Sequence, residues 1–381
     1  MHLLHLFPLT QRTGSPYNAY PLMEQTSLQG HGMKIIDIKA VYPTYTRVVP
    51  SWRTHFWQIV VRVETNAGVS GLASGGGGVA GVEIVNRHFR ELLLGRDVSS
   101  IQDISAIWDD LYAASLPYCR KGLAIMAMSG VDLALYDLLG KAEGKPVYEV
   151  LGGAKKSKIL AYVTGQDSAF YHQLGYKAHK FPHRWTGAEA DYDTAVETAA
   201  RVRALFGPGA MLMIDTYMSW NRAVTEEMAK RLTAFNVYWY EDVLTPDDLE
   251  GQAQLRPVVE PTLIAGGEHE FTPFGFADIA RANALGLWQP DMTWCGGITA
   301  GLRIVEIAKE AAIPVAPHRG GEVWGLHLIA ASDCANLAEY HSDHIQAERD
   351  EVWLGEPQPL DGYIQPPDGP GFDVTLNEQI L

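Results

Sequence analysis

The 381-residue chain is poor in cysteine and in basic side chains. Its three cysteines, Cys119, Cys295 and Cys334, can form no disulfide framework and lack metal-ligand spacing, so we expect a cytoplasmic location. Its 30 Lys and Arg face 45 Asp and Glu, which gives a net charge of −15. Because Lys and Arg carry non-specific binding to nucleic acids and to anionic membranes, this deficit argues against both kinds of partner.

Long uncharged apolar runs are also missing from the sequence. The most apolar stretch, 122–139, carries Asp132 and Asp137, which disfavours a membrane span. The N-terminus has no basic start and Pro8 breaks its apolar run, so we predict a flexible extension over residues 1–32 and no signal peptide. No GxGxxG or GxxxxGK[ST] follows an expected strand within residues 156–354, which disfavours a nucleotide-binding fold there.

Residues 33–155 show the pattern of an α+β domain. Alternating apolar stretches joined at 66–68 are typical of a β-hairpin, and helical spacing follows them. The Pro- and Gly-rich C-terminal segment, 355–381, is expected to return and complete this domain. The glycine run at 74–78 predicts either a mobile loop or a spacer.

Residues 156–354 alternate short apolar strands with helical stretches. The expected strands are KILAYVTG, KAHKFP, MLMID, VYWYED, TLIAGGE, LGLWQPD, IPVAPH and LAEYH. Such a repeat of strand and helix is the signature of a parallel α/β barrel.

Ionisable residues stand where these strands end. In chain order they are Lys180, Asp215, Glu241, Glu268, Asp291, His318 and Glu339. From Asp215 onward they recur every 21 to 27 residues, which is close to one strand–helix unit. Because barrel active sites form at the carboxyl ends of the strands, we expect these groups to meet at one mouth.

Two groupings among these residues carry chemistry. Each of Asp215, Glu241 and Glu268 alone could cap a helix or pair with a lysine. Three converging carboxylates would repel one another without a cation, and oxygen-only ligation suits Mg²⁺ better than Zn²⁺. A carboxylate from Asp291 on one nitrogen of His318 would leave the other nitrogen free to move protons. A lone histidine is more often structural, but His318 lies in a PHRGG turn at the barrel mouth.

At these residues the sequence resembles the enolase superfamily, mandelate racemase subgroup. The resemblance covers nearly everything after residue 33 and includes VDLALYDLLGKAEGKPVYEVLGG, IDTYMSW, WYED, GGEHE, QPD and APH. Within the subgroup the chain is most similar to rhamnonate dehydratases, in KFPHRW, QPDMTWCGGIT and GEPQPLDGYIQPPDGPGF. The resemblance implies a modified (β/α)7β TIM-like barrel with an N-terminal α+β capping domain. It also implies a homo-oligomer, from a dimer to an octamer.

The resemblance assigns roles to the residues at the mouth. It implies Mg²⁺ on Asp215, Glu241 and Glu268, and it implies proton transfer by His318 held by Asp291. Glu339 would hydrogen-bond the substrate carboxylate as it becomes an enediolate.

The chain departs from the racemase pattern on its second barrel strand. There a Lys-x-Lys pair supplies a second base, whereas this chain reads Lys180-Phe181-Pro182. Proline accepts no proton, so two-base racemisation is disfavoured, and Lys180 is left to bind the carboxylate or to act as a base. The segment after the fifth strand, GGEHE, offers no lysine either, unlike the muconate-lactonizing pattern. A single dyad that removes one proton and then assists loss of a hydroxyl group corresponds to dehydration.

Substrate contacts are expected around the rim. Rhamnonate dehydratases have a longer capping loop before the strand that starts near Phe56. Here Arg53 and His55 would be capping contacts, or else surface residues. His183 and Arg184 would bind hydroxyl groups, or else pack within their loop, and the same choice applies to His269.

The resemblance therefore implies a Mg²⁺-dependent acid-sugar dehydratase. It would convert a small-molecule aldonate, L-rhamnonate or a near stereoisomer, to a 2-keto-3-deoxy acid. The alternatives are a dehydratase of another aldonate or aldarate, an isomerase or cycloisomerase with the same dyad, and a non-enzymatic sugar-acid sensor.

Overall fold

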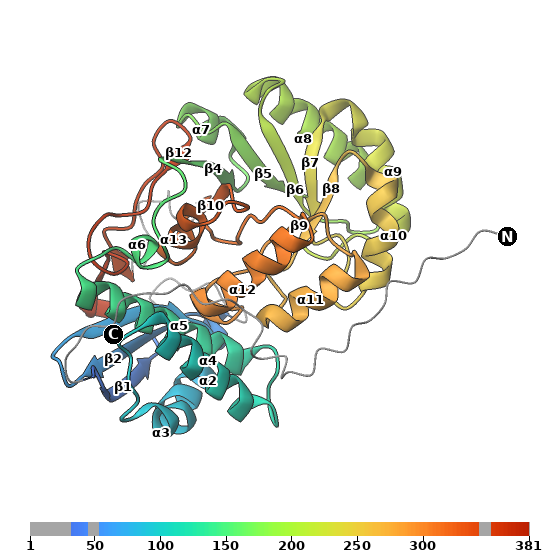
Figure 1. Cartoon of the computed structure of the whole chain (residues 1–381). Helices are drawn as coiled ribbons and strands as arrows, with labels where there is room; N and C mark the ends of the chain where they lie inside the picture. The colour runs from blue at the N-terminus through green and yellow to red at the C-terminus, as the bar shows by residue number, and fades with distance from the viewer. Residues whose placement is uncertain (1–31, 45–52, 343–351, 381) are drawn as a thin grey trace. The chain divides into compact units, whose positions relative to one another are not determined.

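The computed structural model describes residues 32–44, 53–342 and 352–380 (Figure 1). Apart from Gly32, the N-terminal extension predicted for residues 1–32 lies outside these described residues.

The first domain combines an antiparallel sheet with helices. The strands β1 (Ile35–Val41), β2 (Ile59–Thr65) and β3 (Ser70–Gly75) pair in that order, and the predicted hairpin turn at 66–68 is confirmed. Gly68 takes a φ of 76° in this turn, a left-handed conformation that glycine adopts without steric cost. The helices of this domain are α1 (Arg53–Phe56), α2 (Gly78–Glu83), the π-helix η2 (Ile84–Phe89), α3 (Arg90–Leu93), α4 (Ile101–Ser115), α5 (Leu123–Glu143) and α6 (Val147–Val150).

Helix α5 is the central helix of this domain and packs on β3. It is apolar and long enough to cross a membrane, but 89% of its most apolar window is buried inside the protein. A helix that is apolar on all sides is typical of a buried core position. Its apolarity therefore belongs to the core of a soluble fold, in agreement with the sequence prediction.

The glycine run at 74–78 is buried, so the expectation of a mobile loop is wrong. A Cβ at Gly75 would lie 2.8 Å from the Cα of Gly130 in α5, and a Cβ at Gly78 would collide with the backbone of His55. These glycines allow strand, helix and chain to approach closely, which is their physical role here.

The second domain is a parallel barrel. The strand order is β10 (Leu337–His341), β4 (Ile159–Thr164), β5 (Ala178–Pro182), β6 (Met211–Asp215), β7 (Val237–Glu241), β8 (Leu263–Gly266) and β9 (Leu287–Trp288). Single bridges from Val315 to Trp288 and to Ala335 join the two ends of this sheet. The predicted fold class is thus confirmed, although the expected strand IPVAPH is reduced to Val315. Pro314 and Pro317 flank that position and have no N–H to donate to a ladder.

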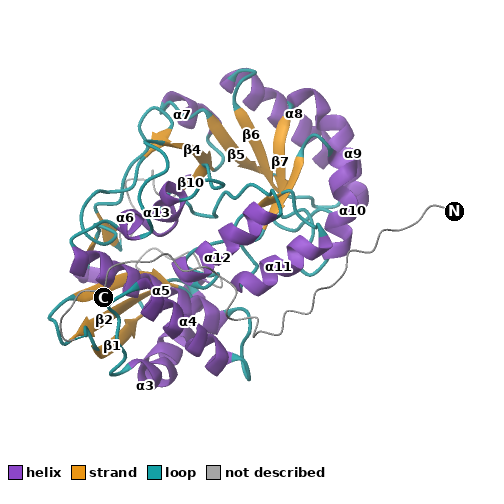
Figure 2. Cartoon of the chain, in the orientation of Figure 1, coloured by secondary structure: helices purple, strands orange, loops and turns teal. Residues whose placement is uncertain are grey.

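Helices cover the outer side of the barrel strands, as Figure 2 shows. Side chains of Asp167, Asn221 and Asp248 accept backbone N–H groups at the start of three of them. The helices are α7 (Ser168–Gln173), α8 (Ala190–Phe206), α9 (Arg222–Leu232), the 3₁₀ turn η3 (Thr233–Phe235), α10 (Leu249–Val259), α11 (Thr272–Ala282), α12 (Gly297–Glu310) and α13 (Val323–Ala331).

The C-terminal segment contacts both domains. Its strand β12 (Tyr363–Ile364) pairs with β4, whereas β11 (Trp353–Leu354) pairs with β13 (Thr375–Leu376). Trp353 Nε1 donates to Ser74 Oγ at 2.6 Å, and Phe372 N donates to Asp137 Oδ1 at 3.0 Å. The chain ends in the 3₁₀ turn η5 (Glu378–Ile380).

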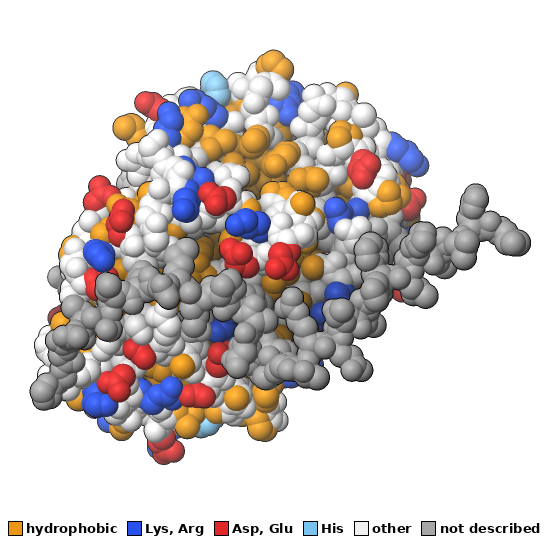
Figure 3. Space-filling view, in the orientation of Figure 1, with side chains coloured by type: hydrophobic (Ala, Val, Ile, Leu, Met, Phe, Trp, Pro, Cys, Tyr) orange, Lys and Arg blue, Asp and Glu red, His pale blue; other side chains and the backbone are white. Residues whose placement is uncertain are grey.

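The loop that follows β9 forms hydrogen bonds with helices of the first domain. Gly296 N donates to Ser129 Oγ at 2.8 Å, and Trp108 Nε1 donates to Gly296 O at 2.7 Å. Asp132 Oδ2 accepts the N–H of Thr299, in the first turn of α12, at 2.9 Å. Charges of both signs are scattered over the face shown in Figure 3.

Candidate active site

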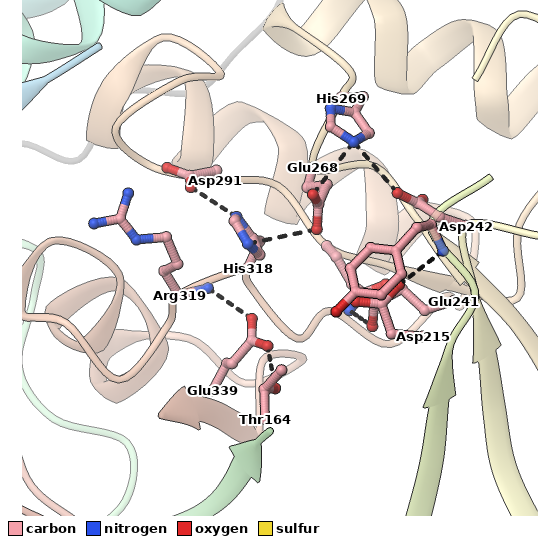
Figure 4. A network of polar contacts seen from close by, with 12 residues as sticks. Thr164, Asp215, Glu241, Asp242, Glu268, His269, Asp291, His318, Arg319 and Glu339 are labelled. Carbon is pink, nitrogen blue, oxygen red and sulfur yellow. Dashed lines mark hydrogen bonds and ion pairs between the residues drawn. The ribbon is translucent and has the colours of Figure 1, made fainter. Parts of the chain in front are cut away.

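The ionisable residues at the strand ends converge at one end of the barrel (Figure 4). Asp215 and Glu241 are the last residues of β6 and β7 and stand side by side in the register. Glu268 and Asp291 follow β8 and β9, and His318 follows the Val315 bridge. The parallel topology therefore collects groups that lie far apart in the sequence.

His318 and Asp291 form a hydrogen-bonded pair. His318 Nδ1 lies 2.8 Å from Asp291 Oδ2, and Asp291 Oδ1 accepts from the backbone N and the hydroxyl of Thr293 at 2.7 and 2.6 Å. With Nδ1 carrying the proton to Asp291, His318 Nε2 points toward Glu268 Oε2 at 3.5 Å. The geometry leaves one imidazole nitrogen facing the acidic centre of the mouth.

Electrostatics strongly favour the charged form of His318. Burial opposes the charge, but the carboxylates of Glu268, Asp291 and Glu339 outweigh it and raise the pKa of His318 to about 10. Because Glu268 contributes to this shift, a cation bound to Glu268 would reduce it.

Lys180 lies at the centre of a buried acidic cluster. Its Nζ pairs with Glu241, lies 2.8 Å from Glu339 Oε1 and lies 3.9 Å from Asp215 Oδ2. Burial opposes the charge of Lys180, but Glu241 and Glu339 outweigh it and hold its pKa well above the ordinary value. The charged lysine can bind an anion, which fits carboxylate binding, and a cation on Glu241 would reduce this shift as one on Glu268 would reduce that of His318.

The carboxylates themselves are fixed by further bonds. Glu241 Oε2 accepts from Trp239 Nε1 at 2.9 Å and from Gln289 Nε2 at 2.6 Å. Glu339 accepts from the hydroxyl of Thr164 and, through Oε2, from Arg319 N at 2.9 Å. Burial would raise the pKa of Glu339, but Lys180 and His318 outweigh it and hold this pKa well below its ordinary range.

Negative charge remains in excess around Glu268. Burial raises the pKa of Asp215 well above its ordinary value, and repulsion from Glu241 adds to this. Burial, with repulsion from Asp242 and Glu241, raises the pKa of Glu268 to about 8. Buried carboxylates that raise one another's pKa values are stabilised by a hard divalent cation, so this oxygen-rich donor set fits Mg²⁺.

Asp242 belongs to this centre and was missed by the sequence analysis. Ligand atoms of Asp242, Glu268 and His269 all lie within 4.8 Å of one another, whereas Glu241 faces Lys180. Asp242 has a φ of 48°, an unfavourable left-handed conformation for a non-glycine residue, and such residues are concentrated at functional sites. The sequence signal for Asp242 was its place directly after Glu241 in WYED, because either of two adjacent acids can face the mouth.

His269 lies beside the predicted metal ligand Glu268. Its Nε2 is 3.3 Å from Glu268 Oε1 and 3.5 Å from Asp242 Oδ2. Burial and the nearby His318 lower the pKa of His269 to about 4, so its ring is neutral and able to accept or donate one hydrogen bond.

The predicted rim residues differ in their surroundings. His183 uses both ring nitrogens, Nδ1 for Trp220 Nε1 at 3.2 Å and Nε2 for the carbonyl of Asp191 at 2.9 Å, which favours packing within its loop over hydroxyl binding. Arg184 is exposed and stands over the ring of Tyr217 at 5.5 Å. His55 is exposed in α1. The side chain of Arg53 lies outside what the structure describes, as does the loop before it.

Two family descriptions match the two parts of the chain. "Mandelate racemase / muconate lactonizing enzyme, N-terminal domain" covers residues 43–152, and "Enolase C-terminal domain-like" covers residues 166–380. The L-rhamnonate dehydratase of Saccharopolyspora erythraea is 33% identical over 330 residues, which is 84% of each chain.

Solved structures of related enzymes are similar to this chain over almost its whole length. The rhamnonate dehydratase from Gibberella zeae complexed with Mg has a TM-score of 0.83 and 28% identity, and the match covers 92% of this chain and 96% of that one. The 3,6-anhydro-D-galactonate cycloisomerase from Zobellia galactanivorans has a TM-score of 0.79 and 26% identity, with coverage of 91% and 97%. The chain belongs to the mandelate racemase and muconate lactonizing enzyme family of the enolase superfamily.

Proposed function

We propose that the protein is a Mg²⁺-dependent acid-sugar dehydratase that acts on L-rhamnonate or a near stereoisomer. The observation that carries this proposal is the single dyad: His318 Nδ1 is bonded to Asp291, and its Nε2 faces the acidic centre. Pro182 occupies the position of the racemase lysine and cannot accept a proton, and Lys180 is paired with Glu241 and Glu339 among the described residues.

Asp215, Glu241 and Glu268 would hold the cation, with Asp242 and His269 close to it. When bound, Mg²⁺ would neutralise the substrate carboxylate and the second negative charge that develops there on loss of the α-proton. Lys180 would bind the same carboxylate as a cation, and Glu339 would hold Lys180 in its charged form.

The proton path runs through one nitrogen. Neutral His318 takes the α-proton on Nε2 while Asp291 stabilises the imidazolium that forms. The same Nε2–H then protonates the 3-hydroxyl group as its C–O bond breaks, and water leaves with the bonding electrons. The enol that remains takes a proton at C3 and releases the proton of its C2 hydroxyl group, which gives the 2-keto-3-deoxy acid.

The test is a panel of aldonates and aldarates incubated with Mg²⁺ and scored for 2-keto-3-deoxy acids. We expect turnover of L-rhamnonate or a close stereoisomer, complete loss of turnover in His318→Asn, and no loss in His172→Asn, an exposed histidine of α7. If only a different acid sugar were turned over, that compound would take the place of L-rhamnonate as the assigned substrate. Retained activity in His318→Asn would overturn the mechanism.

A cycloisomerase is the second candidate, because the Zobellia enzyme shares the fold at 26% identity. The same dyad can remove a proton next to a carboxylate in a ring-opening or ring-closing reaction. Formation of a cyclic product or opening of an anhydro sugar, with no 2-keto-3-deoxy acid, would favour this candidate.

We further propose that the protein works in the cytoplasm as a homo-oligomer with neither nucleic acid nor membrane as a partner. Three free cysteines and the net charge of −15 support the location and the absence of polyanionic partners. The family resemblance supports an assembly from dimer to octamer, which light scattering on a sizing column would measure. A monomer would contradict the assembly.

A further inference from the structure

Arg319 directly follows His318 and has an unusual backbone conformation. Its φ is 53°, in the left-handed region that favours glycine, and its N–H donates to Glu339 Oε2 at 2.9 Å. This conformation costs about 1 kcal/mol for a residue with a Cβ, so the side chain at this position must offset the cost. The backbone of Arg319 thus links the proton-transfer residue to Glu339 on the neighbouring strand β10.

The guanidinium of Arg319 is buried and fully engaged. It forms a bidentate pair with Glu322, with Nε to Oε1 and Nη2 to Oε2 both at 2.8 Å, and the two side chains are only 11% and 6% exposed. Two parallel bonds of this kind fix the orientation of the planar group as well as its charge.

The remaining contacts of the guanidinium come from the capping domain. Trp57 places its ring 5.1 Å from the guanidinium carbon, and the amide oxygen of Gln58, oriented toward the arginine, accepts from Nη1 at 3.2 Å. Both residues directly precede β2 and follow α1. Trp57 also contacts Trp294 edge-on at 6.4 Å, and Trp294 packs at 5.5 Å from the ring of His318. Trp57 is therefore connected to His318 in two ways, through Arg319, which follows it in the chain, and through the ring of Trp294.

A purely local role would require fewer contacts. The pair with Glu322 closes the turn by itself, since the two residues are three apart in the sequence. Contact with Trp57 and Gln58 adds nothing to that turn, but it fixes the turn relative to the capping domain.

We propose that Arg319 is a positioning residue that holds His318 and Glu339 in a fixed position relative to the capping domain. The expected change in kcat rests on the proposed function, whereas the expected change in the structure of the turn does not. Lysine cannot replace arginine fully, because it has neither the fork for Glu322 nor the flat face for Trp57.

The experiment compares Arg319→Met, Arg319→Lys, Trp57→Leu and the double variant Arg319→Met/Trp57→Leu. The matched control is Arg281→Met, because Arg281 forms an exposed pair with Asp278 at the same spacing of three residues. We expect kcat to fall by about 10- to 100-fold in Arg319→Met with KM changed less than about threefold, since small misplacements of a proton-transfer group act on kcat. Arg319→Lys should recover part of this loss.

The double variant separates coupling from local damage. If Arg319 acts together with the capping domain, Trp57→Leu lowers kcat in the wild type but has little further effect in Arg319→Met. Independent effects that multiply, or an Arg319→Met enzyme as active as the Arg281→Met control, would overturn the proposal.

Hydrogen exchange followed by mass spectrometry provides a readout that needs no substrate. In Trp57→Leu, peptides that contain residues 318–322 should exchange faster than in the wild type and in Arg281→Met, because the turn loses its packing on Trp57 and the bond from Arg319 N to Glu339 opens more often. Unchanged exchange there would overturn the inference even if Arg319→Met failed to fold. A wild type without turnover on the acid-sugar panel would instead remove the proposed function and leave this structural test in force.

Discussion

Lys180 Nζ lies 2.8 Å from Glu339 Oε1 inside the barrel, and both side chains are 1% exposed. Removal of the lysine would leave Glu339 and Glu241 buried without their cation. We expect Lys180→Met to lower the free energy of unfolding of the metal-free protein by about 3 kcal/mol, measured by urea denaturation. The control is Lys230→Met, whose pair with Glu227 is exposed and should contribute less than about 1 kcal/mol. Equal stability of the two variants would contradict the buried pair as described.

Metal binding distinguishes the two neighbouring acids after β7. We expect Glu241→Gln to weaken Mg²⁺ binding by more than about tenfold, or about 1.4 kcal/mol, as measured by calorimetry. Asp242→Asn should weaken binding less, because Asp242 would lie beside the cation without holding it. The reverse order would assign the ligand position to Asp242, in keeping with its distance to Glu268 and His269 in the described structure. Chelation of the metal should abolish turnover in either case.

Stability should fall in mild acid because of a buried histidine outside the active site. His327 Nδ1 accepts from Tyr148 N at 3.1 Å, and burial lowers the pKa of His327 to about 3 from its ordinary value of 6.5. Its Nε2 has no partner among the described residues, so a proton there is poorly accommodated. The unfolded chain binds this proton as the pH falls below 6.5, whereas the folded chain does so only near pH 3.

The sign of the effect follows from this difference in proton binding. Full stability is present above pH 6.5 and is lost progressively below it. Between pH 7.5 and 5, the wild type should lose about 2 kcal/mol more of its unfolding free energy than His327→Gln. Denaturation curves at both pH values measure this difference, and parallel losses in the two proteins would exclude His327 as the source.

A single base predicts a defined outcome in heavy water. Pro182 stands at the position of the racemase lysine and cannot move a proton, so the proposed reaction uses His318 as its one base. We expect substrate recovered after partial turnover in D₂O to show no epimer at C2 by NMR. His318→Asn should show neither product nor exchange of the α-proton. An epimer in the recovered acid would reveal a second base and contradict the one-dyad mechanism.

The barrel and its charged mouth could be predicted because the sequence pattern that indicates them repeats within each strand–helix unit. Asp215 and Glu241 end their apolar strands, whereas Lys180 and Glu339 lie within β5 and β10. Parallel topology brings all of these residues to one mouth. The side-by-side register of Asp215 and Glu241 follows directly from that rule. The hydrogen bond between His318 and Asp291 could be anticipated in the same way, because the two residues follow neighbouring strands.

Features that depend on distant parts of the chain could not be predicted. The glycine run at 74–78 has the composition of a flexible linker, and only its approach to Gly130 makes it a packed element. The partners of Arg319 in the capping domain, Trp57 and Gln58, have no local signature. The choice between Glu241 and Asp242 depends on which way the chain turns after β7, and Asp242 takes a left-handed φ that its type does not predict.

The contacts of the C-terminal segment have a consequence for synthesis of the protein. The bonds from Trp353 to Ser74 and from Phe372 to Asp137 span 279 and 235 residues of sequence. The first domain leaves the ribosome early, but it lacks these partners until translation is almost complete. Asp137 Oδ2 accepts from Leu72 N within the domain, but Asp137 Oδ1 and Ser74 Oγ wait for residues 353–372, so the first domain completes these bonds only after the barrel has been synthesised. A nascent chain stalled before Trp353 would therefore present an unfinished first domain beside a nearly complete barrel.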